Sequence, residues 1–421
     1  MVGLLCPASC YHAAMDAILG QERAVHVLAA ALSTGRLHHA YIFHGPAGVG
    51  KFTTARAFAR VLLCHDRQTD LVGRITACGV CESCRLMQPT KPILAEPTKG
   101  KRGKKKDEAQ EIAPDEPDEA DVLDHEPHPD YHVIRKELAA VSEIAALRRK
   151  KQMNIPIDLL RERMIGGEID GNYHDSLAFK TAVLNHGKVF IIDEAELLDQ
   201  HGQNSLLKTL EEPPKDTFII LVTSSEDQLL RTIRSRCQRV GFTALPESVV
   251  ADWLGKHATH LNEAQAQWLA RFVGGSLGRA ELASKYELYN WAKVVLPAIN
   301  DMTKDRYPTE LGGQLAEMIN AFAERWVEEH PGASKEAANK RAAGLMWAMI
   351  SQHARNKINE LAPRCPADDP VAGDATLGPW LGVIDAVQEA ERTLASNVNM
   401  GLTCDALVAA IYRSLAPVSV R

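Results

Sequence analysis

A glycine-rich loop at residues 45–52 constrains this chain more than any other stretch. Its sequence is Gly-Pro-Ala-Gly-Val-Gly-Lys-Phe. The apolar run 40–44 before it predicts a buried strand, and the segment 53–63 after it has apolar residues at helical spacing. A strand, a glycine loop ending in lysine and a helix together favour phosphate binding, because loop N–H groups and the helix N-terminus attract anions. The predicted phosphate-binding residues are Gly45, Gly48, Gly50 and Lys51.

The residue after the lysine departs from the usual loop. A Ser or Thr there supplies a hydroxyl ligand for Mg²⁺, and this chain has Phe52 instead. Thr53 lies about 100° further around the helix, so we do not expect it to substitute. Because Mg²⁺ neutralises charge during phosphoryl transfer, we expect this chain's own ATPase to be weak or absent. Binding of ATP and Mg²⁺ stays open, since the lysine is kept.

A second apolar run, residues 188–192, ends in two acids, Asp193 and Glu194. A strand that is buried on both faces delivers the residues at its carboxyl end to the edge where phosphates bind. We therefore predict that Asp193 holds Mg²⁺, directly or through water, and that Glu194 polarises the attacking water.

Further strands and helices alternate along the chain. A helix is predicted at 203–211, a buried strand at 217–223 and a last strand at 239–242. This alternation, with a phosphate loop after the first strand, predicts a doubly wound α/β domain with a parallel sheet. Beyond it the pattern is largely helical, with a loop expected at 363–379.

Four cysteines form a group behind the first predicted strand and helix. They are Cys64, Cys78, Cys81 and Cys84. Four soft ligands suit tetrahedral zinc, and no open coordination position is implied, so we predict a structural zinc site. Free thiols are the alternative, and His65 could replace Cys64 as a ligand. A ferredoxin-type cluster would need a cysteine at position 88, which is Gln.

Charge and composition limit the partners of the chain. The formal net charge of −6 makes the chain as a whole a poor nucleic-acid binder on its own. No apolar run approaches the roughly 20 residues that span a bilayer, and residues 1–12 lack the pattern of a signal peptide. We therefore expect no membrane role and a cytoplasmic location.

Residues 89–127 differ in composition from the rest. A basic block at 99–106 is followed by an acidic, proline-containing stretch at 107–126. Blocks of like charge bury too little apolar area to offset the entropy of ordering, so we predict a disordered insertion. A solvated linker is the simplest interpretation, and contact of the basic block with DNA or an acidic partner is the alternative.

The motifs taken together resemble those of bacterial clamp-loader AAA+ subunits, the delta-prime and gamma/tau subunits of the DNA polymerase III holoenzyme. The resemblance covers about residues 16–290 outside the insertion. It is carried by the glycine loop, the cysteine group, Ile-Ile-Asp-Glu-Ala-Glu at 191–196, Asn-Ser-Leu-Leu-Lys-Thr-Leu-Glu-Glu-Pro-Pro at 204–214 and Ser-Arg-Cys at 235–237.

The resemblance implies a domain plan and two further site residues. The plan is an AAA+ core at 1–245 with a zinc module at 64–88 and the insertion at 89–127, a helical lid at 246–293 and a helical collar at 294–421 that packs subunits into a ring. Arg236 would be an arginine finger acting on a neighbouring subunit's ATP site, where the alternative is a surface arginine favoured by a helix end. Thr223 falls at the sensor 1 position, and Arg279 lies in a segment similar to the sensor 2 region.

Three functions compete on these grounds. The first is a delta-prime-like subunit that lends Arg236 to a neighbour, so that the ring loads the sliding clamp on primed DNA at the nucleoid. The second is a gamma/tau-type ATPase motor, and the third is an unrelated P-loop ATPase or helicase. Phe52 favours the first, because a motor subunit is expected to keep the hydroxyl. The implied partners are gamma/tau and delta subunits.

Overall fold

The computed structural model describes residues 18–70, 73–88, 127–148, 154–329, 334–364, 370–395 and 399–416. The chain divides into two compact units. The N-terminal unit is Met1–His257 with Val273–Glu281, and the C-terminal unit is Ala258–Phe272 with Leu282–Arg421. The predicted disordered insertion lies outside the described residues except for Pro127. In the described parts of the chain, no helix has the length and apolar character needed to cross a membrane.

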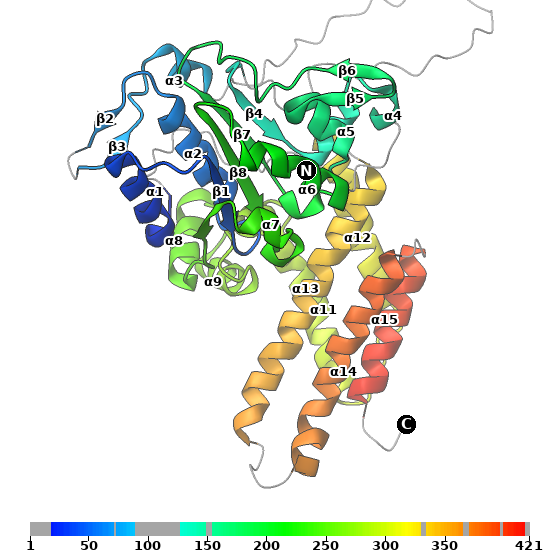
Figure 1. The fold of residues 1–421 in the computed structure, drawn as a ribbon. Coiled ribbons are helices and arrows are strands. Elements are labelled where there is room, and N and C mark those ends of the chain that lie inside the picture. The colour runs from blue at the N-terminus through cyan, green and yellow to red at the C-terminus, as the bar shows by residue number, and fades with distance from the viewer. Residues whose placement is uncertain are drawn as a thin grey trace, which may run out of the picture. The chain divides into compact units, whose positions relative to one another are not determined.

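A five-stranded parallel sheet lies at the centre of the N-terminal unit (Figure 1). The strand order is β4 (Tyr131–Ile134), β7 (Lys188–Ile192), β8 (Thr217–Thr223), β1 (Ala40–His44) and β9 (Gln238–Gly241). Each neighbouring pair runs in parallel. The first strand of the sequence therefore sits inside the sheet, and chain crossovers lead away from it in both directions. The predicted doubly wound α/β fold is confirmed.

The other described elements of this unit are short apart from the four helices α1, α2, α6 and α8. They are α1 (Glu22–Thr34), α2 (Lys51–Leu63), β2 (Gln68–Thr69), β3 (Ile75–Thr76), α3 (Glu82–Leu86), η4 (Lys136–Val141), α4 (Ala145–Arg148), α5 (Ile157–Leu160), η5 (Arg161–Ile165), β5 (Gly167–Ile169), β6 (Asn172–His174), η6 (Ala195–Leu197), α6 (Gln200–Glu211), η7 (Glu226–Gln228), α7 (Arg231–Arg234) and α8 (Glu247–His257).

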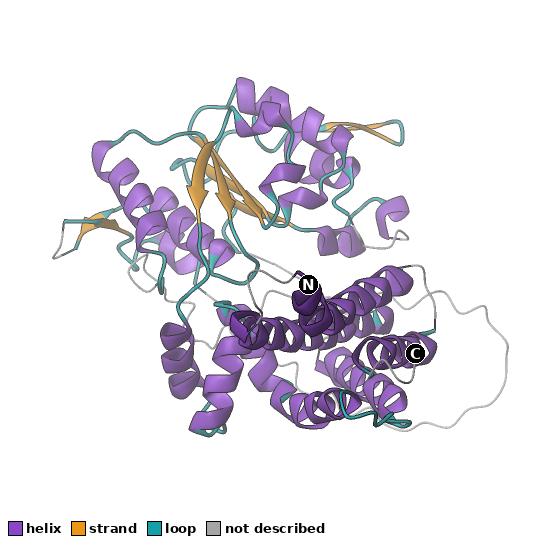
Figure 2. Ribbon diagram, turned by 90° about the horizontal axis from the view of Figure 1, so that it is seen from below, coloured by secondary structure: helices purple, strands orange, loops and turns teal. Residues whose placement is uncertain are grey.

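Helices cover both faces of the sheet because side chains alternate along each strand. On one face Tyr41 meets Phe58 of α2 edge-on, with ring centroids 5.3 Å apart. On the other face Ile42 belongs to a buried core with Leu206 and Leu210 of α6. Figure 2 shows the strands lying between helices. Strands buried on both faces explain why β1, β7 and β8 are nearly continuous apolar runs.

Two boundaries differ slightly from the sequence prediction. The helix α6 begins at Gln200 rather than at 203, because the Asp199 side chain accepts a hydrogen bond from Gly202 N at 2.6 Å and caps the helix there. The strand β9 ends at Gly241 rather than at 242.

The C-terminal unit is helical in its described residues. Its helices are α9 (Glu263–Phe272), α11 (Leu288–Met302), α12 (Leu311–Glu329), α13 (Lys335–Leu361), η8 (Ala362–Arg364), α14 (Pro370–Ala395) and α15 (Met400–Leu415), and α10 (Leu277–Lys285) connects the two units. Within the unit, α12 to α15 pack side by side as long helices (Figure 1). The residues Met346, Trp347 and Met349 are buried in this packing.

The prediction of a loop at 363–379 is wrong from residue 370 onward. The helix α14 begins at Pro370 and contains Pro379. Proline is tolerated at the first position of a helix, where its missing N–H would have no partner. The buried residues Trp380 and Val383 then continue an apolar face, so tertiary packing outweighs the local Pro, Asp and Gly content.

Candidate nucleotide site and cysteine cluster

The glycine loop connects β1 to α2 at the carboxyl end of the sheet. Gly45, Gly48 and Gly50 have φ angles of 142°, 74° and 98°, which side chains rarely adopt. At Gly48 a Cβ atom would also lie 2.3 Å from the Ser276 hydroxyl oxygen. The helix α2 starts at Lys51 immediately after these turns. The backbone therefore has the form that a phosphate loop requires.

Lys51 is buried at the base of this loop, with 6% of its surface exposed. Its Nζ donates hydrogen bonds to the carbonyl oxygens of Gly45 at 2.7 Å and Pro46 at 2.6 Å. Burial lowers the pKa of Lys51, and the carboxylates of Glu196 and Asp193 act in the opposite direction. The lysine is thus close enough to these two acids, which follow β7, for its charge to interact with theirs.

The register of two neighbouring strands brings a basic pair onto these acids. In the pairing of β4 with β7, Ile134 lies beside Ile192. One residue further, Arg135 Nε is 3.4 Å from Asp193 Oδ2. At the next position of each segment, Lys136 Nζ lies 2.6 Å from Glu194 Oε2. Both predicted acids therefore have a basic partner.

Arg135 also contacts the residue that replaces the hydroxyl. Its guanidinium carbon lies 4.2 Å from the centre of the Phe52 ring, a cation–π geometry. Only 7% of the arginine is exposed. Burial raises the pKa of Asp193, whereas the positive charge of Arg135 lowers it. At the two positions where a phosphate loop usually holds Mg²⁺, this chain has the Phe52 ring and the carboxylate of Asp193, which is already paired with a guanidinium. These two groups do not fit Mg²⁺.

Sequence reasoning missed Arg135 and Lys136, although a signal was present. A basic pair follows the strand 131–134 directly, just as the acidic pair follows 188–192. It also missed Glu196, whose Oε1 accepts a hydrogen bond from Ser224 N at 3.1 Å. Burial alone would raise the pKa of Glu196, but hydrogen bonds from the Ser224 and Thr223 side chains dominate and hold it below the usual range.

Thr223 ends β8 next to the end of β1, where it lies beside His44 in the strand pairing. The residue is buried, and its hydroxyl oxygen accepts a hydrogen bond from Ser225 N at 3.1 Å. The structure therefore places Thr223 at the sheet edge that carries the glycine loop.

Arg236 follows the short helix α7 and is about one-third exposed. Its guanidinium lies 2.6 Å from Glu211 Oε1 and donates a hydrogen bond to the Thr232 carbonyl at 2.9 Å. Glu211 is the last residue of α6 and Thr232 lies in α7, so neither partner belongs to the glycine loop. The contacts describe a surface arginine whose guanidinium remains accessible.

The four predicted zinc ligands converge in a cluster. Their sulfur atoms all lie within 4.8 Å of one another, and those of Cys64 and Cys81 are 3.9 Å apart. Four sulfurs about 2.3 Å from a tetrahedral zinc would be separated by about 3.8 Å. His65 instead stacks on His186 with ring centroids 3.9 Å apart, so Cys64 is the residue that joins the cluster.

Backbone N–H groups surround these sulfurs. Cys78 N and Cys81 N point at the preceding cysteine sulfurs at 3.3 Å each. N–H groups of Val80 and Cys81 lower the pKa of the Cys78 thiol to about 6, whereas burial raises that of Cys84 to about 12. Hydrogen bonds to sulfur stabilise the thiolate form that ligates metal, so the donor set fits a structural zinc ion.

The sequence of this chain matches a known protein family. Residues 20–113 and 101–246 match the family described as DNA polymerase III, delta subunit, which is more than half of the chain. The chain belongs to this family.

Relatives of this DNA polymerase III family member carry two kinds of name. The gamma/tau subunit of Mycobacterium tuberculosis is 31% identical over 229 residues, which is 54% of this chain and 28% of the relative. The tau subunit of Escherichia coli is 30% identical over 351 residues, 82% of this chain and 43% of the relative. The delta' subunit of Escherichia coli is 28% identical over 253 residues, which is 60% of this chain and 56% of the relative. The chain thus spans less than half of the length of these gamma/tau and tau relatives.

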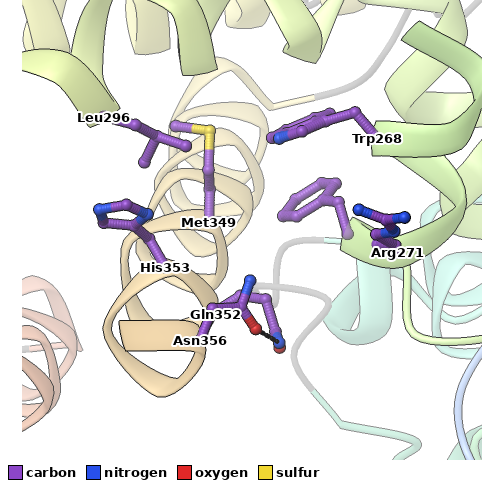
Figure 3. A pocket seen from close by; sticks show the side chains of 8 residues that line it. Trp268, Arg271, Leu296, Met349, Gln352, His353 and Asn356 are labelled. Atoms are coloured by element: carbon purple, nitrogen blue, oxygen red, sulfur yellow. Dashed lines mark hydrogen bonds between the residues drawn. The ribbon is translucent and has the colours of Figure 1, made fainter. Parts of the chain in front are cut away.

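A pocket in the C-terminal unit of this family member lies outside all the motifs. Its volume is about 140 Å³, and Figure 3 shows side chains of α9, α11 and α13 around it. The lining residues are Trp268, Arg271, Phe272, Leu296, Met349, Gln352, His353 and Asn356. His353 bonds Asn300 at 2.9 Å, and Gln352 donates to Asn356 at 3.0 Å. These polar groups have partners within the helices, and the pocket brings together none of the predicted site residues.

Proposed function

We propose that this chain is a delta-prime-type clamp-loader subunit. It joins gamma/tau and delta subunits in a ring in the cytoplasm, at the nucleoid, and lends Arg236 to the ATP site of a neighbouring subunit. The ring then loads the sliding clamp on primed DNA. Membership of the DNA polymerase III family supports this assignment, and the geometry of the chain's own nucleotide site favours it over the alternatives.

The observation that carries the proposal is the pairing of Asp193 with Arg135 and of Glu194 with Lys136. Hydrolysis at this site would require free carboxylates to organise charge and water. Here both carboxylates face cations, and Phe52 brings no hydroxyl. We propose that this chain instead contributes to hydrolysis through a different surface.

Arg236 is suited to that contribution. Its ion pair with Glu211 is exposed, at 35% for the arginine and 49% for the glutamate side chain. Pairs of this kind stabilise a protein by no more than about 1 kcal/mol, so a phosphate of a neighbour's nucleotide can replace Glu211 as the partner. An arginine finger accelerates phosphoryl transfer by about 10³–10⁵.

We further propose that the cysteine cluster holds one structural zinc ion. The four ligands would be Cys64, Cys78, Cys81 and Cys84. Bound there, the metal would tie the C-terminal end of α2 to α3, since Cys64 follows α2 and Cys84 lies in α3.

A gamma/tau-type motor is the second candidate. The retained Lys51 and the identity to gamma/tau relatives favour it. It requires the chain itself to turn over ATP, which the delta-prime-type role does not.

The arginine finger is tested in a reconstituted ring with the partner subunits. Arg236→Ala is expected to slow hydrolysis at the adjoining ATP site by about 10³-fold, measured as single-turnover, DNA-stimulated phosphate release. Arg234→Ala is the matched control, because Arg234 is the last residue of α7, two positions before Arg236, and pairs with the exposed carboxylate of Asp227. Unchanged hydrolysis by an assembled Arg236→Ala ring would show that the finger assignment is wrong.

A further inference from the structure

The glycine loop keeps the groups that bind phosphate but not those that bind a divalent cation. Gly45, Gly48 and Gly50 hold the turned backbone, and Lys51 stands at the start of a helix of 13 residues. The lysine Nζ contacts backbone carbonyls, which are weaker acceptors than phosphate oxygens. An entering phosphate group can therefore replace these carbonyls as the partner of Lys51.

A positively charged side chain contacts both residues that a metal site would use. Arg135 packs its guanidinium against the Phe52 ring and next to Asp193, the two residues between which a metal would be shared. The arginine is buried and held on two sides, so its charge and direction are fixed before any ligand arrives. A guanidinium stays protonated at all physiological pH values and binds phosphate through parallel hydrogen bonds.

We propose that Arg135 replaces Mg²⁺ in this loop, and that the loop binds a polyphosphate group in its metal-free form. The ligand class is a di- or triphosphate chain, carried by a nucleotide or free in solution. Lys51 and Arg135 would bind it together, with Asp193 keeping the guanidinium in place rather than ligating metal. The role is one of binding, because Glu194 is paired with Lys136 and no nucleophile is activated.

The same geometry sets the response to magnesium. A Mg²⁺ ion bound to the polyphosphate would bring a double positive charge close to the fixed Arg135 charge, and like charges repel. It would also compete for Asp193, whose carboxylate is needed by the arginine. Binding should therefore be no tighter with Mg²⁺ than without it, which is the reverse of the behaviour of a metal-dependent phosphate loop.

The experiment is titration calorimetry of the full chain with ATP and with inorganic triphosphate, each in EDTA and in excess Mg²⁺. We expect binding in EDTA, with an affinity equal to or higher than that in Mg²⁺. Arg135→Gln should weaken binding in EDTA by tenfold or more, about the size of one charge-assisted hydrogen bond. Arg161→Gln is the control, since Arg161 pairs with Asp158 on the surface of the same unit, and its affinity should equal that of the unchanged protein.

The two ligands distinguish the sources of the polyphosphate. Tighter binding of ATP than of triphosphate identifies a nucleotide, and equal binding identifies the phosphate chain alone. The metal comparison needs no variant, so it stands even if Arg135→Gln fails to fold. Tighter binding in Mg²⁺, or an absence of binding in EDTA, would overturn the proposal. The inference does not rest on Arg236, so its failure leaves the ring experiment unaffected.

Discussion

The two ends of helix α2 carry two sites that differ in how complete their ligand sets are. Its N-terminus follows the glycine loop, and Cys64 comes directly after its last residue, Leu63. At the cysteine end all four ligands converge within 4.8 Å. At the phosphate end one ligand is replaced by Phe52, and Arg135 lies over its ring. The cysteine end therefore has a full set of four candidate metal ligands, whereas the phosphate end lacks one ligand and has a buried guanidinium beside it.

The largest expected effect comes from the cysteine end. Replacing one ligand, Cys84→Ala, should reduce the zinc content from about one ion per chain to near zero and lower the melting temperature of the protein. Structural zinc binding is worth on the order of 10 kcal/mol, so the loss is large. Metal analysis and circular dichroism measure the two quantities.

Cys404→Ala serves as the control for that experiment. Cys404 is also fully buried but lies in α15, outside the cluster. It should leave the zinc content unchanged. A Cys84→Ala protein that retains its zinc, or an unchanged protein that contains none, would contradict the assignment of the cluster.

A smaller effect is expected at the phosphate end. Arg135→Gln should destabilise the chain by about 3 kcal/mol, because it leaves the carboxylate of Asp193 without its buried cation. Lys136→Gln, one residue on, should cost about 0.5 kcal/mol, since its pair with Glu194 is more exposed. Urea denaturation compares the two variants. Equal losses would mean that Arg135 is no more than another surface partner of the acids.

The sequence was sufficient for the central strands of the N-terminal unit and for the cysteine cluster. The apolar runs predicted the strands β1, β7 and β8, because strands buried on both faces need continuous apolar residues. The cysteine spacing predicted the cluster, because three of its members lie within seven residues and local turns bring them together. In both cases the signal is local.

The parts that sequence reasoning missed depend on contacts between distant segments. Arg135 meets Asp193 only because β4 and β7 pair in one register, with Ile134 beside Ile192. The partner of Arg236, Glu211, likewise comes from the end of another helix. The expected loop before residue 379 became part of α14 because packing outweighed local composition. Register and packing are set by the whole fold, which a linear motif does not record.

On the proposed function, this chain assists hydrolysis at a neighbouring subunit and does not hydrolyse ATP itself. The most direct measurement is phosphate release from ATP by the isolated full chain with Mg²⁺ present. Because Phe52 offers no hydroxyl ligand and both acids are paired with basic side chains, we predict release no faster than in buffer alone. Sustained turnover by the isolated chain that Lys51→Ala abolishes would contradict the claim and identify the chain as a motor subunit.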